Sequence, residues 1–351
     1  MEKIDNVKLN KDKRDTNVVK GDNKKNIVLM FPGQGSQYLK MGFDFLNLDK
    51  DLGFKKYLDI ASEKTKFDIL QIISNENGDG LGNNLGQTFF SQVSILGLSC
   101  FLSDYLFKFL GLNKNNILCS LGHSLGDYSA LYSCGYFSFE DVLDIVIYRA
   151  KLMSKANETL EGAMAAIIGI DSDELANIIN EFNDLDNKYH KVFIANYNDY
   201  TQSVITGKKV DVEKFLDFLK SKSNAKAIPL KVNTASHCPL MQQVSVKMGE
   251  YLERITLKEP IVKFYSSSQL IFPSTSMIKD VLKNQLISPI NWVKSIEFLL
   301  TSNSEIFIEV GPGKVLSGLV KKIAAKNGKK VEIFNTDNLL EIENIKKFFN
   351  F

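Results

Sequence analysis

The sequence contains only four cysteines, and their spacing favours neither a metal site nor a disulfide framework. No C-x-x-C pair occurs, no histidine follows at a metal-ligand spacing, and three of the four lie in or beside apolar runs. We therefore expect Cys100, Cys119, Cys134 and Cys238 to be buried free thiols in a reducing compartment. No bound metal is expected.

A long uninterrupted apolar run is also missing. The most apolar stretch, residues 88–112, contains Gln92, Asp104 and Lys108, each of which is costly at the centre of a bilayer. It predicts a core helix and no membrane span. The start of the chain has no apolar signal-peptide core, and its five acidic side chains argue against an intact mitochondrial or plastid transit peptide, with a trimmed remnant as the alternative.

A large excess of charge is absent, because 43 Lys and Arg stand against 41 Asp and Glu, a net charge of +2. Neither nucleic acid nor a membrane surface is therefore expected as the main partner. Apolar side chains make up 44% of the 351 residues, enough for one large or two modest globular domains. Residues 1–26 contain no aromatic side chain and few aliphatic ones, and we expect this extension to be disordered.

Continuous apolar runs end repeatedly at glycine-rich turns, which is typical of strands buried on both faces of a parallel sheet. The run at 27–31 ends in Pro32-Gly33-Gln34-Gly35, and the run at 117–121 ends at Gly122. Similar runs occur at 262–265 and 306–310, and helical segments separate them all. The sequence therefore predicts a wound α/β core.

The middle of the chain has a different order of elements. We expect strands at 163–170, 192–197, 203–206 and 227–232, and helices at 172–182, capped by Asp171, and at 212–221. The order βαββαβ is that of a ferredoxin-like unit inserted into the core. We expect a core of residues 27–154 and 234–351 with a small subdomain at 155–233, and surface loops at 75–86 and 183–188.

Gly122-His123-Ser124-Leu125-Gly126 fits the pattern G-x-S-x-G. It follows a predicted strand and opens a predicted helix, which is the context of a nucleophile elbow. The two glycines permit a sharp strand-to-helix turn, and the serine hydroxyl is then presented at a helix N-terminus. The alternative is a plain glycine-rich turn.

A nucleophilic serine needs a base, and the chain has only three histidines. His123 adjoins Ser124 and leaves the turn in another direction, and His190 lies beside a loop rich in Asp and Asn. His237 follows the last strand of the inserted unit, where the chain returns to the core. It is the best candidate by elimination, although a lone histidine is more often structural.

The glycine-rich loop at 31–37 lacks the Gly-Lys-Ser/Thr of a phosphate-binding loop and the G-x-G-x-x-G of a dinucleotide site. It can instead place the Gln34 amide opposite the Leu125 amide, where the two would stabilise an oxyanion. Arg149 lies in a helical stretch with an apolar face. From the residues alone, a surface charge is a better interpretation of Arg149 than a carboxylate clamp.

Lysines gather near the C-terminus, in a predicted helix and the turn after it: Lys314, Lys321, Lys322, Lys326, Lys329 and Lys330. A solvated helical face and a docking patch for an acidic protein explain this cluster equally well.

Seven separated blocks occur in the order of one known family. They are 31–37 (FPGQGSQ), 122–131 (GHSLGDYSAL), 149–153 (RAKLM), 162–168 (GAMAAII), 236–238 (SHC), 285–292 (QLISPINW) and 309–319 (EVGPGKVLSGL). In these blocks the sequence resembles the malonyl-CoA:acyl carrier protein transacylases of type II fatty-acid synthesis. The resemblance implies a hydrolase-like α/β core with a parallel sheet and an inserted ferredoxin-like subdomain.

The resemblance also implies roles for single residues. Ser124 would be the nucleophile, His237 the base, and the backbone carbonyl of Gln285 would orient His237. The Gln34 and Leu125 amides would form the oxyanion hole, and Arg149 would bind the malonyl carboxylate, which reverses the interpretation from the residues alone. His123 and Asn196 would line the pocket.

Malonyl-CoA and acyl carrier protein are the partners that the resemblance implies, with ping-pong chemistry and no cofactor. Departures from the family pattern are Asp127 in place of Glu, Ala235 in place of Pro, and a tract at 86–90 without Thr-Gln-Pro-Ala. A serine hydrolase or thioesterase is the rival enzyme, and a non-catalytic carrier-binding scaffold is the rival outside enzymes. We expect a monomer in a plastid-type organelle (apicoplast or chloroplast stroma), with the cytoplasm as the alternative.

Overall fold

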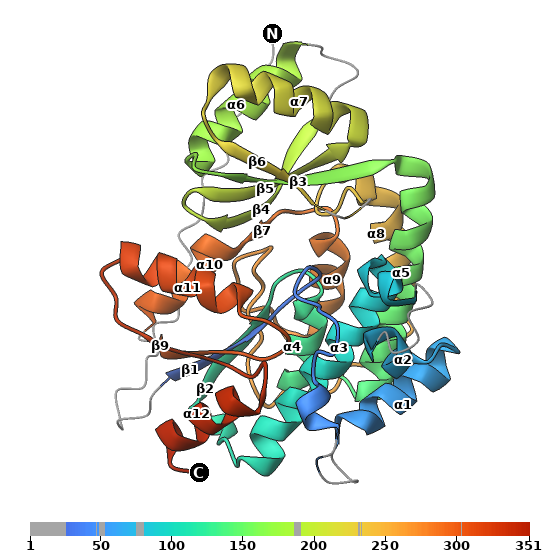
Figure 1. Cartoon of the computed structure of the whole chain (residues 1–351), viewed down its shortest axis with the longest axis vertical. Helices are drawn as coiled ribbons and strands as arrows, with labels where there is room; N and C mark the ends of the chain where they lie inside the picture. The colour runs from blue at the N-terminus through green and yellow to red at the C-terminus, as the bar shows by residue number, and fades with distance from the viewer. Residues whose placement is uncertain are drawn as a thin grey trace.

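The computed structural model describes residues 26–46, 48, 53–74, 81–185, 191–230, 232, 234–302 and 304–351. It has a large α/β part with a smaller part of sheet and helices stacked on one end (Figure 1). Residues 1–25 of the expected disordered extension lie outside the described residues. Asn26 begins the first strand.

The large part is built on four parallel strands in the order β2-β1-β8-β9. The apolar runs predict three of them, β1 (Asn26–Phe31), β2 (Ile117–Gly122) and β8 (Ser304–Glu309). The fourth, β9 (Glu332–Asn335), has no such pattern, because it is a short edge strand that is only partly buried. The predicted parallel α/β core is thus confirmed.

The strand expected at 262–265 is wrong as a full strand. The segment makes one isolated bridge, in which the Ser120 amide donates to the Lys263 carbonyl at 2.9 Å and the Tyr265 amide donates to the Ser120 carbonyl at 2.9 Å. Val262, Phe264 and Tyr265 are buried, which explains the apolar run. Burial of these side chains does not require a continued ladder.

Helices cover both faces of this sheet (Figure 1). Ile27, Leu29 and Phe31 of β1 belong to a core shared with α1 (Phe54–Thr65), α2 (Ile69–Ser74), α3 (Thr88–Asp104), α4 (Gly126–Cys134), α5 (Phe139–Leu160), α8 (Gln242–Leu252), α9 (Ile278–Gln285) and α12 (Leu339–Phe349). Val28 and Met30 pack with α10 (Trp292–Thr301) and α11 (Val315–Lys326) on the opposite face. Alternate side chains of one strand therefore serve two cores.

The predicted core helix is confirmed as α3, which continues into a π-helical turn at Tyr105–Phe109. By length and composition the stretch Thr88–Phe109 could cross a membrane, but 89% of its most apolar window is buried inside the protein. All four cysteines are buried with free thiols, as expected.

The smaller part is a sheet with the order β6-β3-β5-β4-β7. Its own elements are β3 (Gly162–Ile168), α6 (Ser172–Leu185), β4 (Val192–Asp199), β5 (Gln202–Lys208), α7 (Lys209–Lys222) and β6 (Lys226–Pro229). The predicted order βαββαβ is thus present, with α6 and α7 packed on one face of the sheet. The last strand, β7 (Ile290–Asn291), comes from the returning chain and pairs in parallel with β4.

The helix cap is where the sequence places it, since the Asp171 carboxylate accepts from the Asp173 amide at 2.8 Å. The predicted loop at 183–188 is wrong for its first residues, which are helical to Leu185. There the Asn183 amide donates to the Val192 carbonyl at 2.9 Å and its oxygen accepts from the Val192 amide at 3.0 Å, which ties the helix end to β4. Residues 186–190 lie outside the described part.

The other predicted loop, at 75–86, also needs correction. Residues Leu81–Gly86 form a 3-10 helix, while 75–80 lie outside the described residues. Strand β6 ends at Pro229, earlier than expected. The division at residues 154/155 and 233/234 stays a prediction, and α5 runs on to Leu160.

Candidate active site

Ser124 lies on the turn between β2 and α4, with a left-handed backbone (φ 56°) that is costly for a non-glycine residue. A Cβ on Gly122 would lie 2.0 Å from the Asp127 amide nitrogen, and one on Gly126 would lie 1.9 Å from the Phe31 carbonyl oxygen. Neither position has room for any other residue. The glycines of the motif thus make the strained turn possible, and the predicted strand-turn-helix context is confirmed.

His237 is the histidine that meets the serine. Its Nε2 lies 2.8 Å from Ser124 Oγ, and its Nδ1 lies 2.8 Å from the backbone carbonyl oxygen of Gln285. Because a carbonyl can only accept, Nδ1 carries the proton and Nε2 presents its lone pair to the serine hydroxyl. Burial lowers the pKa of His237 to about 3, so the ring is neutral at neutral pH.

His123 makes its contacts elsewhere. His123 Nε2 lies 3.0 Å from Asn198 Oδ1, and the ring packs against Trp292 with centroids 5.7 Å apart. Burial lowers the pKa of His123 as well. His190 lies outside the described residues.

Gln285 contacts the elbow through its side chain as well as its backbone. Its Nε2 donates to the Ser124 carbonyl oxygen at 2.9 Å and to an oxygen of the buried carboxyl group of Asp127. Asp127 also accepts from the Gly122 amide at 3.1 Å, and burial raises the pKa of Asp127 to about 8. One residue therefore braces both the base and the turn that carries the nucleophile.

Arg149 is 2% exposed, so the surface interpretation drawn from the residues alone is wrong. Its Nη1 donates to Gln92 Oε1 at 2.6 Å, and its Nη2 lies 3.4 Å from Ser124 Oγ. Across the described residues it has no carboxylate partner, and its buried Nε has no hydrogen-bond acceptor. Burial lowers the pKa of Arg149, although an arginine stays charged in a protein.

A buried charge without a counter-ion is expensive, because the protein interior repays desolvation only through pairing. The face of the Tyr128 ring lies 5.5 Å from the Arg149 guanidinium carbon, which offsets only part of that cost. The site is therefore prepared for an anion beside Ser124.

The glycine-rich loop after β1 lies against the elbow. A Cβ on Gly33 would lie 2.3 Å from the His123 carbonyl oxygen and 3.6 Å from the Leu125 amide nitrogen. Among the hydrogen bonds of the described residues, neither the Gln34 nor the Leu125 amide donates to a protein group. One such amide follows Ser124 and the other lies on the loop that contacts the elbow, which are the donors that an oxyanion hole needs.

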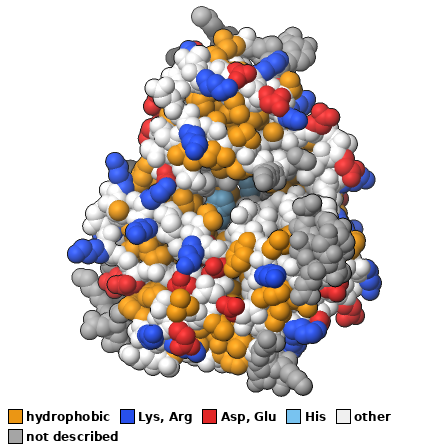
Figure 2. Space-filling model, in the orientation of Figure 1, with side chains coloured by type: hydrophobic (Ala, Val, Ile, Leu, Met, Phe, Trp, Pro, Cys, Tyr) orange, Lys and Arg blue, Asp and Glu red, His pale blue; other side chains and the backbone are white. Residues whose placement is uncertain are grey.

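A cavity of about 220 Å³ extends from this loop between the two parts of the molecule. Its wall includes His123 and Asn196, as expected, and apolar side chains of β5 and α11. In Figure 2 histidine side chains are visible in a hollow between the upper and lower parts. Ser124 itself does not line this cavity, but the adjoining His123 does, so the cavity lies beside the elbow. Its partly apolar wall suits a long, flexible acyl carrier arm.

The sequence analysis does not predict the roles of two residues of this site, Gln92 and Asn198. It also does not predict the contact of Asp127 with Gln285. Asn198 follows Asn196 at the period of a strand, and this spacing would have predicted its place beside Asn196. Gln92 appears in the sequence only as an interruption of an apolar run, and no motif links it to Arg149.

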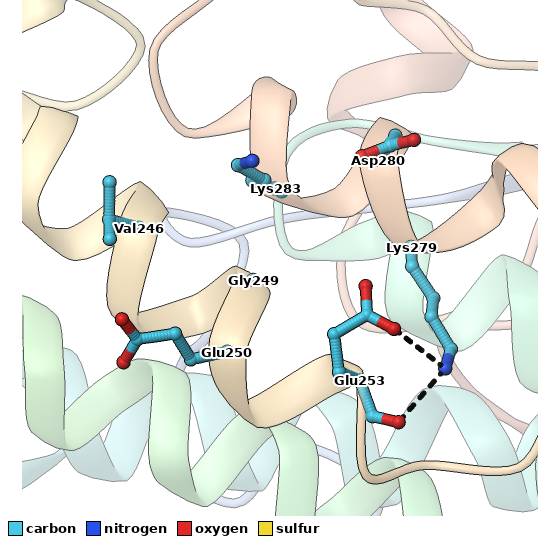
Figure 3. A pocket seen from close by; sticks show the side chains of 7 residues that line it. All are labelled: Val246, Gly249, Glu250, Glu253, Lys279, Asp280 and Lys283. Atoms are coloured by element: carbon cyan, nitrogen blue, oxygen red, sulfur yellow. Dashed lines mark hydrogen bonds and ion pairs between the residues drawn. The ribbon is translucent and has the colours of Figure 1, made fainter.

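A second cavity, of about 250 Å³, lies between α8 and α9 (Figure 3). Val246, Gly249, Glu250, Glu253, Lys279, Asp280 and Lys283 line it. Lys279 Nζ donates to the Glu253 carbonyl oxygen at 3.2 Å and lies 3.5 Å from the Glu253 carboxylate. These charges pair with each other, and none of the Ser124 site residues lines this cavity.

Comparison with known proteins matches residues 28–336 to the acyl transferase domain family. A malonyl CoA-acyl carrier protein transacylase of Bacillus subtilis is 35% identical over 298 residues, which covers 85% of this chain and 90% of the relative. This chain belongs to the malonyl CoA-acyl carrier protein transacylase family. A transacylase of Haemophilus influenzae is 31% identical, over 85% of this chain and 92% of the relative.

Solved structures of transacylases have the same fold. An acyl carrier protein S-malonyltransferase of Vibrio cholerae superposes with a TM-score of 0.81 at 30% identity, covering 92% of this chain and all of the other. A malonyl transacylase solved in complex with its type II PKS acyl-carrier protein gives a TM-score of 0.83 at 29% identity, covering 93% of this chain and 100% of the other. The sequence comparison and the structure comparison thus indicate the same family.

Proposed function

We propose that this protein transfers the malonyl group of malonyl-CoA to the phosphopantetheine thiol of acyl carrier protein, through a malonyl ester on Ser124, and so supplies the extender unit for fatty-acid synthesis. The observation that carries the proposal is the buried Arg149, whose charge has no carboxylate partner within the described part of the chain and whose Nη2 lies 3.4 Å from Ser124 Oγ. The names of the relatives support the same reaction.

In the first half-reaction, His237 Nε2 takes the Ser124 proton while Oγ attacks the thioester carbonyl carbon. The Gln34 and Leu125 amides hold the oxyanion that forms. When the tetrahedral intermediate collapses, the carbon–sulfur bond breaks, and the imidazolium returns its proton to the departing CoA sulfur. The Gln285 carbonyl stabilises the transient charge on His237 through Nδ1–H, in place of a triad carboxylate.

The second half-reaction runs the same steps backwards with a different thiol. His237 removes the proton of the carrier protein's phosphopantetheine thiol, the thiolate attacks the malonyl ester, and Ser124 recovers its proton. Each half-reaction conserves charge and needs no metal or redox cofactor. Throughout, Arg149 holds the malonyl carboxylate, and His123 and Asn196 line the path of the pantetheine arm.

The rival enzyme, a hydrolase, would use the same serine and histidine but would have to admit water to the acyl-enzyme. A neutral acyl group would leave the charge of Arg149 without a counter-ion, and a buried unpaired charge then opposes binding. The non-catalytic scaffold is disfavoured because the Ser124–His237 hydrogen bond is formed at 2.8 Å.

We also propose that the protein is a monomer and that it works in a plastid-type organelle, with the cytoplasm as the alternative.

The deciding experiment incubates the protein with radiolabelled malonyl-CoA, maps the labelled peptide, and then adds holo-acyl carrier protein. We expect label on the peptide that contains Ser124, followed by its transfer to the carrier protein. Rapid release of free malonate without transfer would identify a hydrolase, and absence of any labelled peptide would exclude the covalent route.

A further inference from the structure

Gln92 is a fully buried polar residue of α3 whose two side-chain ends are both engaged. Its Oε1 accepts from Arg149 Nη1 at 2.6 Å, and its Nε2 donates to the sulfur of Met153 at 3.4 Å. Met153 lies one turn after Arg149 on α5, so the amide is fixed between two residues of one helix. The guanidinium is thereby held in a single orientation.

The neighbouring turn of α3 contacts the other side of the site. Thr88 Oγ1 lies 3.5 Å from Gln34 Nε2, and Thr88 and Gln92 share one helix face because they are four residues apart. This face of α3 therefore touches both the loop that carries the Gln34 amide and the arginine beside Ser124. No motif assigns either contact a role.

The chemistry of the contact matters as much as its geometry. An amide oxygen accepts a hydrogen bond from a guanidinium but adds no negative charge, whereas a carboxylate in the same place would form an internal ion pair. With Gln92, one guanidinium nitrogen is anchored, while Nη2 lies near Ser124 and Nε has no acceptor among the described residues. The positive charge of Arg149 therefore stays available to pair with a carboxylate of the acyl group.

We propose that Gln92 is a positioning residue for acyl selectivity: its neutral amide fixes the orientation of Arg149 and leaves the charge of that arginine for the carboxylate of the acyl group. The inference rests on the proposed role of Arg149 in binding malonyl. It adds that selectivity depends on the neutrality of a residue that never touches the substrate.

Two substitutions separate orientation from charge. Gln92→Glu keeps the shape and supplies a counter-ion, so we expect the KM for malonyl-CoA to rise about tenfold or more while acetyl transfer holds or rises. Gln92→Met keeps the volume but loses the hydrogen bond, so kcat for malonyl transfer should fall while the preference for malonyl over acetyl shrinks less than in Gln92→Glu. Ser94→Ala is the matched control, because Ser94 is buried on the same helix and its hydroxyl has no partner among the described residues.

The readout is the ratio of kcat/KM for malonyl-CoA to that for acetyl-CoA, which a general loss of stability would not change. Thermal unfolding of each variant checks the fold. A folded Gln92→Glu protein with the wild-type ratio overturns the inference, and if that variant does not fold, a wild-type ratio and kcat in Gln92→Met do so instead.

Arg149→Ala, assayed in parallel, distinguishes failure of this inference from failure of the proposed function. If Arg149→Ala loses the malonyl preference while both Gln92 variants keep it, only the role of Gln92 is wrong. If Arg149→Ala itself keeps the preference, the proposed role of Arg149 fails, and the inference fails with it.

Discussion

Ser124 Oγ and His237 Nε2 lie 2.8 Å apart although 113 residues separate them in the chain. Both residues have left-handed backbones, with φ of 56° and 62°. The His237 amide donates to the Leu286 carbonyl at 3.0 Å, and the ring is held by the carbonyl of the adjacent Gln285. The surrounding structure thus holds two strained backbone positions in place, and this keeps the serine and the histidine in the geometry needed for reaction.

Ser124→Ala should abolish stable labelling by malonyl-CoA, because among the described residues no other hydroxyl lies at hydrogen-bonding distance from His237 Nε2. Mass spectrometry of the intact protein after incubation with malonyl-CoA measures this directly. Label at the wild-type level on the variant would show that another residue is acylated.

His237→Ala should slow acylation at least about 1,000-fold while the protein stays folded.

The reaction of Ser124 should persist at unusually low pH. The pKa of His237 is lowered by burial from 6.5 to about 3, so the free enzyme keeps a neutral base until the pH approaches that value. We expect the rate of inactivation by phenylmethylsulfonyl fluoride, which has no ionisable group, to show no decline between pH 7 and about 5. A decline centred near 6.5 would contradict the depressed pKa.

The control for that experiment is to check that the protein is still folded at each pH. The unfolded chain binds a proton at His237 below its ordinary pKa of 6.5, while the folded chain resists protonation. Stability from this residue is therefore lost as the pH falls from about 6.5 towards 3. Circular dichroism at each pH shows where the protein is still native.

Asp127 should make folding less favourable as the pH rises. Burial raises its pKa from 3.8 to about 8, so between these values the unfolded chain releases a proton that the folded chain retains. Stability from this group is greatest at low pH and declines up to about pH 8. Asp127→Asn should flatten that part of the curve of unfolding free energy against pH, measured with urea. An unchanged slope would show that Asp127 is ionised in the native state.

Arg149→Ala should reduce malonyl transfer about 100-fold or more, because one partner of a buried charged pair is removed. Acetyl transfer should hold or rise, since the unpaired guanidinium no longer opposes a neutral acyl group. Arg149→Lys should restore malonyl transfer only in part, because lysine keeps the charge but loses the planar fork. Both substrates are assayed with all three proteins, and parallel loss of both activities would indicate a structural role.

The lysine cluster can be tested at one residue. Lys321 is exposed on α11, whereas Lys322 lies 3.1 Å from the carboxylate of Asp199 and Lys314 lies 2.6 Å from that of Glu341. Lys321→Glu should therefore raise the KM for carrier protein about threefold or more and leave that for malonyl-CoA unchanged. Lys347→Glu, an equal charge reversal on an exposed site of α12, is the control. Equal KM values in the wild type and Lys321→Glu would place docking elsewhere.

The sequence predicts those parts of the site that are local in the chain. The elbow is contained in five residues, and both of its glycines are required by contacts under 2.5 Å to a hypothetical Cβ. The βαββαβ order follows from the alternation of apolar patterns. Elimination predicts His237 as the base because the chain has only three histidines, and the structure places its Nε2 2.8 Å from Ser124 Oγ.

What the sequence could not predict depends on contacts between distant elements. The burial of Arg149 follows from the packing of α5 against α3, and a single guanidinium in a helical pattern carries no sign of this. The Gln285–Asp127 contact joins residues 158 positions apart. Strand β9 is held by its pairing with β8, and its own four residues have no strong pattern.

The two-residue strand β7 links the small sheet to the segment that orients the base. Its pairing with β4 joins Asn196 to Ile290, and the segment from Gln285 to Ile290 contains the carbonyl that orients His237. Asn196 also lines the cavity beside the Ser124 turn. The wall of that cavity and the carbonyl that sets the direction of the imidazole are therefore joined through one short strand pairing.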